Sequence, residues 1–229
     1  MEKLYQILKD TTLKDAIEAE HWDRVFIALQ DMYKNLDNKD FFIPLIIANA
    51  LICYQLSSSW EEYWEEFAHE ASKYRLEKVS DIFLFLIDFL PASQGNKRLV
   101  PTKIQRLKKL KNFLDEFFYK QKFYYNHMEK LQQDLAREMQ QIQTAKTIVF
   151  AVKMQWYGAR IRFWEIKTFP KKICIPIDSR LQNIYKKYKW KHTLATEFYM
   201  ELSEKLDIPP LHLDAVLWCN YDMFMQKQI

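Results

Sequence analysis

Glycine is scarce in this chain of 229 residues, which contains only Gly95 and Gly158. Loops that cradle the phosphates of a nucleotide are built from several glycines, so a nucleotide-binding loop of that kind is excluded. Period-2 alternation of apolar and polar residues, the pattern of a half-buried strand, is also missing. Both absences argue against a β-rich fold and direct attention to helices.

Cysteine is the next shortage. The three cysteines, Cys53, Cys174 and Cys219, lie far apart and form no Cys-x-x-Cys pair. This spacing excludes zinc ribbons and four-cysteine iron–sulfur clusters, and we expect neither a metal nor another cofactor. Isolated cysteines fit a reducing compartment, so we expect an intracellular protein of the cytoplasm or nucleoid.

Long apolar runs are absent as well. The longest, residues 41–54, is interrupted by Pro44 and Asn49. It is too short and too polar to span a bilayer and is better interpreted as a buried helix. The first residues of the chain show no signal-peptide pattern. We therefore expect no membrane partner.

Hydrophobic residues make up 49% of the chain and aromatic residues 16%, which is ample for a buried core. The net charge of +4 is mild and indicates a local basic face rather than a wholly cationic protein. Helical periodicity dominates and predicts an all-α fold. The predicted helices lie near 2–18, 22–36, 42–56, 60–73, 75–90, 101–119, 121–140, 146–163, 179–190, 193–206 and 210–225.

Lys153 lies within the predicted helix 146–163 and is the first candidate for chemistry. Four apolar side chains share its helical face because they lie three or four positions away: Val149, Phe150, Trp156 and Tyr157. Loss of hydration lowers the pKa of a lysine and frees its amine to act as a nucleophile. The alternative is that the stem of Lys153 lies along apolar surface while its amine stays in water.

Asp178 follows Lys153 by 25 positions (178 − 153), at the start of the predicted helix 179–190. A nucleophilic lysine and a nearby carboxylate could form and break a Schiff base at a sugar carbon. Asp178 is also a favoured type of helix N-cap. The two interpretations of Asp178 are compatible.

Four segments around these residues carry a resemblance to a known family: 49–56, 61–67, 146–153, and 175–178 with 208–218. They resemble the archaeal-type GO glycosylases, which are 8-oxoguanine DNA glycosylase/lyases of the helix-hairpin-helix superfamily. The order and approximate spacing of the segments fit that family along most of the chain. The chain lacks a glycine-rich hairpin, and the corresponding turn would lie near Gln140–Ala145.

The resemblance implies a fold of two helical subdomains that flank a cleft. Residues 1–40 and 165–229 would form the terminal subdomain. Residues 41–164 would form a central bundle that carries the hairpin near 140–145 and the helix of the catalytic lysine.

The resemblance also implies an activity. The enzyme would flip 8-oxoguanine out of double-stranded DNA and remove it, with Lys153 attacking the sugar C1′ and Asp178 stabilising the developing charge. The resulting Schiff base would allow strand cleavage by β-elimination. Two rival interpretations stay open: a glycosylase for another damaged base, and a non-catalytic helical DNA-binding module. Intact Lys153 and Asp178 count against the second.

The resemblance assigns substrate binding to two tryptophans and a carboxylate. Trp218 would stack on the flipped base, and Asp214, four positions away on the same helical face, would accept hydrogen bonds from it. Trp64 resembles a second tryptophan of the pocket, but Trp60 shares its helical face and stays a candidate. Without the resemblance, Trp218 would be taken as a core residue and Asp214 as a surface carboxylate.

Two further positions concern the space around the flipped base. Gln55 would enter the gap that the base leaves, although a solvated glutamine at a helix end is an equal alternative. The family also reads the base with an N-terminal glutamine, which is missing here. Trp22 stands in that neighbourhood and is the candidate to replace it.

Phosphate binding requires basic side chains or backbone amides. Arg160 and Arg162 lie beside the catalytic segment, and the predicted hairpin supplies Gln143 and Lys146. A denser basic cluster is less favoured by position: Lys97, Arg98, Lys103, Arg106, Lys108, Lys109 and Lys111. His212 is interpreted as a core histidine without a role. We expect a monomer whose partner is double-stranded DNA containing 8-oxoguanine.

Overall fold

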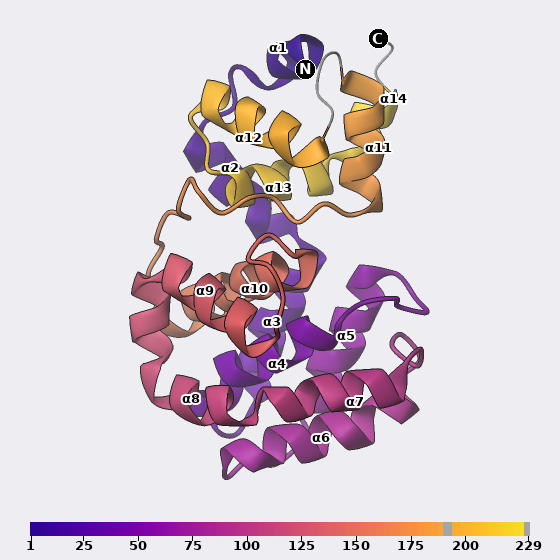
Figure 1. Cartoon of the computed structure of the whole chain (residues 1–229), viewed down its shortest axis with the longest axis vertical. Coiled ribbons are helices and arrows are strands. Elements are labelled where there is room, and N and C mark those ends of the chain that lie inside the picture. The colour runs from indigo at the N-terminus through magenta and orange to yellow at the C-terminus, as the bar shows by residue number, and fades with distance from the viewer. Residues whose placement is uncertain (190–193, 227–229) are drawn as a thin grey trace. The chain divides into compact units, whose positions relative to one another are not determined.

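The computed structural model describes residues 1–189 and 194–226, and within these ranges it contains helices and loops but no β-strand (Figure 1). The prediction of an all-α fold is confirmed. No helix among the described residues is both long and apolar enough to cross a bilayer.

The chain divides into two compact units. The terminal unit combines Met1–Asp23 with Thr168–Ile229, and the central unit is Arg24–Lys167. The sequence placed residues 24–40 in the terminal part, whereas the structure places them in the central unit. The reason is packing, because α3 (Arg24–Asn35) lies against α5 (Trp60–Ala71) and α10 (Lys146–Phe163).

The central unit is a helical bundle whose remaining elements follow one another along the chain. They are η2 (Lys39–Phe41), α4 (Phe42–Ile52), α6 (Val79–Ala92), α7 (Val100–Lys109), α8 (Lys111–Asn126) and α9 (Met128–Glu138). Some predicted boundaries were wrong here. The helix predicted over 42–56 ends at Ile52. The predicted break near 120 corresponds to a kink at Lys120, where the backbone within α8 is not helical. The structure has further breaks at Leu110 and His127, where the backbone turns between helices.

The core of the central unit is built on α4 and α10. Every residue of α4 is buried, as is every residue of α10 from Ile148 to Ile161. The two helices pack closely at Gly158, where an added Cβ would lie 2.8 Å from Cδ1 of Ile46. Since real Cβ atoms do not approach so closely, glycine at 158 permits this packing. The helix that carries Lys153 is therefore fixed in the middle of its unit.

The terminal unit contains α1 (Glu2–Leu8), α2 (Leu13–Ala19), η1 (Glu20–Trp22), α11 (Ser179–Tyr188), α12 (Ala195–Leu206), α13 (Pro210–Cys219) and α14 (Tyr221–Gln226). The helix predicted over 2–18 is two helices, because Thr12 and Asp15 form a capping box that starts α2. The helix predicted over 210–225 is broken at Asn220. Residues 190 and 193, at the ends of two predicted helices, lie outside the described residues.

The core of the terminal unit gathers side chains from its first and last helices. Leu4 and Ala16 come from the N-terminal segment, and Leu181, Phe198 and Leu213 come from the C-terminal one. The unit is thus assembled from the two ends of the chain. Its α13 packs on α2, α11 and α12, which fixes the helix of Asp214 and Trp218.

Candidate active site

The hairpin lies between α9 and α10, at the predicted turn. Gln140 adopts a left-handed conformation (φ 52°), and the amide of Gln141 donates to the carbonyl of Ala136 at 2.9 Å. This is the helix C-terminal motif that glycine usually closes, here made with glutamine. The exposed side chain of Gln143 lies on the turn, and Lys146 is the exposed first residue of α10.

Lys153 lies seven residues into α10 and is only 5% exposed. Its Nζ lies 5.3 Å from the ring centroid of Tyr157. Val149, Phe150 and Trp156, which the helical spacing predicted as neighbours on its face, are buried as well. Lys153 therefore exposes little of its surface to solvent.

Asp178 is the N-cap of α11, as its residue type predicted. One carboxylate oxygen, Oδ1, accepts from the amide of Leu181 at 2.8 Å. The side chain is partly exposed, so the cap does not bury it. The capping bond fixes the orientation of the carboxylate, which is what a charge-stabilising group requires.

Asp214 faces the same part of the terminal unit as Asp178. Burial, and then the charges of Asp178 and Asp214, raise the pKa of Tyr199. The Tyr199 hydroxyl donates to the carbonyl of Leu181 at 2.6 Å, next to the cap. Tyr199 is therefore a neutral donor that both carboxylates share as a neighbour.

Trp218 lies one helical turn after Asp214 on α13 and is partly exposed. The guanidinium carbon of Arg180 lies 4.0 Å from the centroid of its ring, a cation–π distance. Arg180 was missed from the sequence, although it stands only two residues after Asp178. The terminal unit thus brings together Asp178, Asp214 and Trp218, with Arg180 stacked on the tryptophan.

The two tryptophans of α5 differ in exposure. Trp64 is fully buried and its ring centroid lies 5.3 Å from that of Phe67. Trp60 is partly exposed and meets Phe150 edge to face at 4.2 Å. Trp60 therefore offers the accessible ring, while Trp64 supports it from the core. In the terminal unit, Trp22 of η1 is 75% exposed.

Gln55 was predicted at the end of a helix, and the structure places it three residues beyond α4. Its side chain is exposed and its backbone is left-handed (φ 49°). Residues other than glycine adopt this conformation at a cost, and such positions often mark functional turns.

The predicted phosphate ligands Arg160 and Arg162 are bound within the central unit. Arg162 donates to the carbonyl of Lys39 and to Oε1 of Gln121, and it forms an ion pair with Asp40. Arg160 is buried, with its guanidinium carbon 5.1 Å from the ring of Phe26. Both guanidinium groups therefore make contacts within the central unit.

His212 is fully buried, as the core interpretation expected. Its Nδ1 lies 2.8 Å from a carboxylate oxygen of Glu20, and its Nε2 accepts from the amide of Phe169 at 3.2 Å. All three residues belong to the terminal unit. The histidine ties the first segment of that unit to the second.

Two other buried groups of the central unit are possible rivals to Lys153. Burial lowers the pKa of Lys103 to about 8 and raises the pKa of the Cys53 thiol. Lys103 donates to the side chain of Asn96, so its amine is held by a structural partner. Among the described residues, no group of His, Cys, Asp and Glu side chains is arranged to hold a metal ion.

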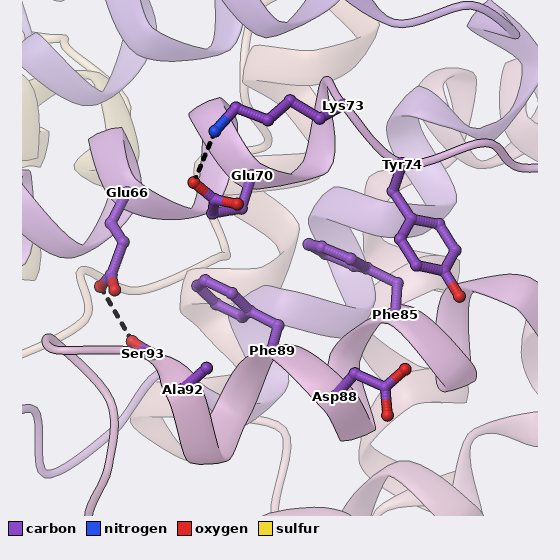
Figure 2. A pocket seen from close by; sticks show the side chains of 9 residues that line it. All are labelled: Glu66, Glu70, Lys73, Tyr74, Phe85, Asp88, Phe89, Ala92 and Ser93. Atoms are coloured by element: carbon purple, nitrogen blue, oxygen red, sulfur yellow. Dashed lines mark hydrogen bonds and ion pairs between the residues drawn. The ribbon is translucent and has the colours of Figure 1, made fainter.

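A surface pocket lies between α5 and α6 and contains none of the candidate residues (Figure 2). Its lining includes Glu66, whose carboxylate accepts from the hydroxyl of Ser93 at 2.8 Å and from the amides of Gln94 and Gly95 at 2.7 and 3.0 Å. The pocket therefore marks the anchoring point of the loop that follows α6.

An all-helical chain in which a hairpin leads into a helix with a buried lysine, and in which an aspartate caps a later helix, has the architecture of a helix-hairpin-helix DNA glycosylase. The comparison with a solved structure agrees. The structure of an 8-oxoguanine DNA glycosylase from Pyrobaculum aerophilum, complexed with 8-oxoguanosine, has a TM-score of 0.82 to this chain. It is 20% identical, and the match covers 95% of this chain and 85% of that one.

The family described as AGOG, N-glycosylase/DNA lyase, matches residues 5–229, and the chain belongs to this family. It is 38% identical to an N-glycosylase/DNA lyase of Thermococcus kodakarensis, over 95% of this chain and 82% of the relative. It is 34% identical to one of Methanococcus maripaludis, over 95% and 87%. The protein is therefore an enzyme of the bifunctional N-glycosylase/DNA lyase class, and the interpretation as a non-catalytic module is wrong.

Proposed function

We propose that this N-glycosylase/DNA lyase removes 8-oxoguanine from double-stranded DNA and then cleaves the strand through a Schiff base on Lys153. The observation that carries the proposal is the buried amine of Lys153 in the middle of α10. The relative from Pyrobaculum aerophilum, which is described as an 8-oxoguanine DNA glycosylase, supports the choice of base. We further propose that the protein acts as a monomer inside the cell.

The chemistry assigned to Lys153 is covalent catalysis. The lone pair of Nζ forms a bond to C1′ while the glycosidic bond breaks and the departing base takes its electron pair. Loss of a proton from Nζ and opening of the sugar ring give a Schiff base. Loss of a C2′ proton then expels the 3′ phosphate by β-elimination.

The terminal unit supplies the groups assigned to charge and base recognition. Asp178 stabilises the positive charge that develops on the sugar and assists proton transfer. Trp218 stacks on the flipped base, and Asp214 accepts hydrogen bonds from its polar edge. Arg180 covers part of the Trp218 ring, so we assign stacking to ring surface that Arg180 leaves uncovered.

DNA contacts in the central unit are assigned to two turns. Backbone amides of the hairpin and the first turn of α10, with Gln143 and Lys146, bind the phosphate backbone. Gln55 enters the gap left by the base, and Trp60 with Trp64 behind it borders the pocket. We assign no phosphate contact to Arg160 or Arg162, because their guanidinium groups are bound within the unit.

A glycosylase for another damaged base is the second candidate. One observation favours it, since the exposed Trp22 stands where the family has a base-reading glutamine. A panel of duplexes that carry different damaged bases separates the two candidates. Asp214→Asn should then mainly reduce discrimination between the preferred lesion and its undamaged parent.

The test of the central assignment is borohydride trapping on a duplex with 8-oxoguanine. Wild-type protein should become fixed to the DNA, because a reduced Schiff base is stable. Lys153→Gln should abolish trapping and keep DNA affinity. The matched control is Lys103→Gln, which removes another buried amine of the central unit and should still trap. Trapping by Lys153→Gln would assign the nucleophile to another amine and overturn the proposal.

A further inference from the structure

Arg106 of α7 connects three parts of the central unit that the chain separates widely. Its Nη2 donates to Oε1 of Gln141 in the hairpin at 2.6 Å and to the hydroxyl of Thr147 in the first turn of α10 at 2.8 Å. Its guanidinium carbon lies 5.8 Å from the ring centroid of Tyr54, the residue before Gln55. One side chain therefore contacts the hairpin, the start of the catalytic helix and the turn that carries Gln55.

Tyr54 also lies near a second basic side chain of α7. Lys103, one helical turn before Arg106 on α7, is fully buried and its Nζ lies 5.0 Å from the Tyr54 centroid. Lys103 donates to the side chain of Asn96, whose own amide group reaches the carbonyl of Ile52 at 3.4 Å. The aromatic ring thus lies near two basic side chains that come from one face of α7.

The loop that presents Asn96 is anchored rather than free. Glu66 binds its first residues, as Figure 2 shows for Ser93, and the amide of Asn96 donates to the Ser93 hydroxyl at 2.9 Å. The carbonyl of Gly95 accepts from the amide of Ser57 at 2.8 Å, just after Gln55. An added Cβ at Gly95 would lie 2.7 Å from Oγ of Ser58, so this close approach requires glycine.

Two features show that the arrangement costs stability. Gln55 holds a left-handed backbone, and the buried Nε of Arg106 has no hydrogen-bond partner among the described residues. An unpaired buried donor lowers stability, because it loses its hydrogen bonds to water without replacing them. Costs of this kind persist where the geometry serves a function.

We propose that Arg106 is a positioning residue that couples the Tyr54–Gln55 turn to the hairpin and the start of α10. Phosphate binding at the hairpin and insertion of Gln55 into the gap then occur together, because the same guanidinium fixes both turns. The inference rests on the DNA-binding role proposed above for the hairpin and for Gln55. It adds a residue that links them without touching the base or the sugar.

The test uses a duplex with 8-oxoguanine and 2-aminopurine opposite the lesion, whose fluorescence reports unstacking when the gap is filled. Arg106→Met should slow the fluorescence change on the order of tenfold, the size of a typical coupling between sites. It should lower kcat and leave KM for the duplex nearly unchanged. The matched control is Lys108→Met, which removes one charge from an exposed position of the same helix. Equal effects of the two variants would overturn the proposal, since they would reflect charge alone.

A second measurement substitutes the contact partners of Arg106 and leaves Arg106 itself unchanged. Its result therefore does not depend on whether Arg106→Met folds. Gln141→Ala with Thr147→Val removes the hairpin side of the link, and Tyr54→Leu removes the other side. If Arg106 couples them, combining both sets should slow the fluorescence change less than the product of the separate effects. Multiplicative effects would overturn the coupling.

Gln55→Ala separates this inference from the function on which it rests. If Gln55→Ala leaves the fluorescence change intact, the gap-filling role of Gln55 fails, and the coupling fails with it. If Gln55→Ala suppresses the change while Arg106→Met behaves like Lys108→Met, only the coupling fails. Trapping through Lys153 is measured in parallel and decides the catalytic assignment on its own.

Discussion

The terminal and central units hold their candidate residues in opposite ways. Asp178 and Trp218 of the terminal unit are partly exposed, and they make close contacts with Leu181 and Arg180 respectively. Lys153 of the central unit lies in the middle of a helix that is buried along most of its length. The proposed roles would account for this difference, because an amine gains nucleophilicity from desolvation. A carboxylate that stabilises charge must keep that charge and meet the substrate.

The polar contacts of the candidate residues also differ between the two units. In the central unit, α7 links the hairpin, the Tyr54 turn and the anchored loop through Lys103 and Arg106. In the terminal unit, Asp178 caps α11 and Asp214 lies on α13, and both have Tyr199 as a neutral neighbour. The contacts of the central unit therefore join several elements through α7.

The largest expected effect is that of Asp178→Asn, which keeps the shape and much of the capping ability but removes the charge. Base release in single-turnover assays should fall by about 10²–10³-fold, the usual effect of removing one charge-stabilising group. The free energy of unfolding should fall by about 1 kcal/mol or less if capping is the only structural role. An active but strongly destabilised variant would reduce Asp178 to a helix cap.

Tryptophan-to-alanine changes compare the two units directly. Trp64→Ala should lower the free energy of unfolding by about 3–5 kcal/mol in urea titrations, because it empties a fully buried site. Trp218→Ala should change stability less and should weaken binding to the lesion duplex by roughly 1–3 kcal/mol through lost stacking.

The control for Trp218→Ala is an abasic duplex, which offers no base to stack. Binding to that duplex should be weakened less than binding to the lesion duplex. Equal weakening on lesion, abasic and undamaged duplexes would mean that the C-terminal part of α13 is structural.

Lys103 predicts a pH dependence of stability in the central unit. Burial lowers its pKa to about 8 from the ordinary value of 10.5, so between these pH values the unfolded chain binds more protons than the folded one. The stability of the wild type relative to Lys103→Met should therefore rise as the pH increases from about 8 to about 10.5. Below about pH 8 the difference should be constant. Urea unfolding of both proteins across this range measures it, and a flat difference would contradict the burial of the charge.

The smallest expected effect is a change in the salt dependence of DNA affinity. It distinguishes an exposed basic residue from one that is bound within the fold. Lys146→Ala should reduce the slope of log affinity against log salt concentration by about 1, because one phosphate contact is lost. Arg162→Ala should leave that slope unchanged and lower the unfolding free energy, since it removes bonds to Lys39 and Gln121. The opposite pattern would assign a phosphate contact to Arg162.

Sequence reasoning was most reliable where periodicity and packing agree. The bounds of α10 were predicted correctly from a continuous apolar pattern that tertiary packing preserves. The helix over 42–56 was predicted too long, because the apolar pattern continues through Cys53 while the backbone leaves the helix there to form the Tyr54–Gln55 turn. The break at Thr12 was missed although Thr12 and Asp15 have the spacing of a capping box.

For the candidate site residues, too, local features could be predicted and distant contacts could not. The burial of Lys153 could be predicted because its apolar neighbours are local in sequence. The contacts of Arg106 and Arg162 could not be predicted, since their partners lie 35 or more positions away along the chain. Charge patterns in sequence identify basic residues but do not distinguish those that bind phosphate from those that hold the fold together.

The N-cap of α11 links the proposed activity of Asp178 to the order of one helical turn. One oxygen of Asp178 holds the amide of Leu181, so the orientation of the carboxylate exists only while the first turn of α11 exists. Fraying of that turn would switch off the proposed catalytic group before the rest of the unit unfolds. A partly unfolded molecule would then be inactive and would not cleave undamaged DNA at random. The helix cap therefore makes the proposed catalysis depend on local order at the start of α11.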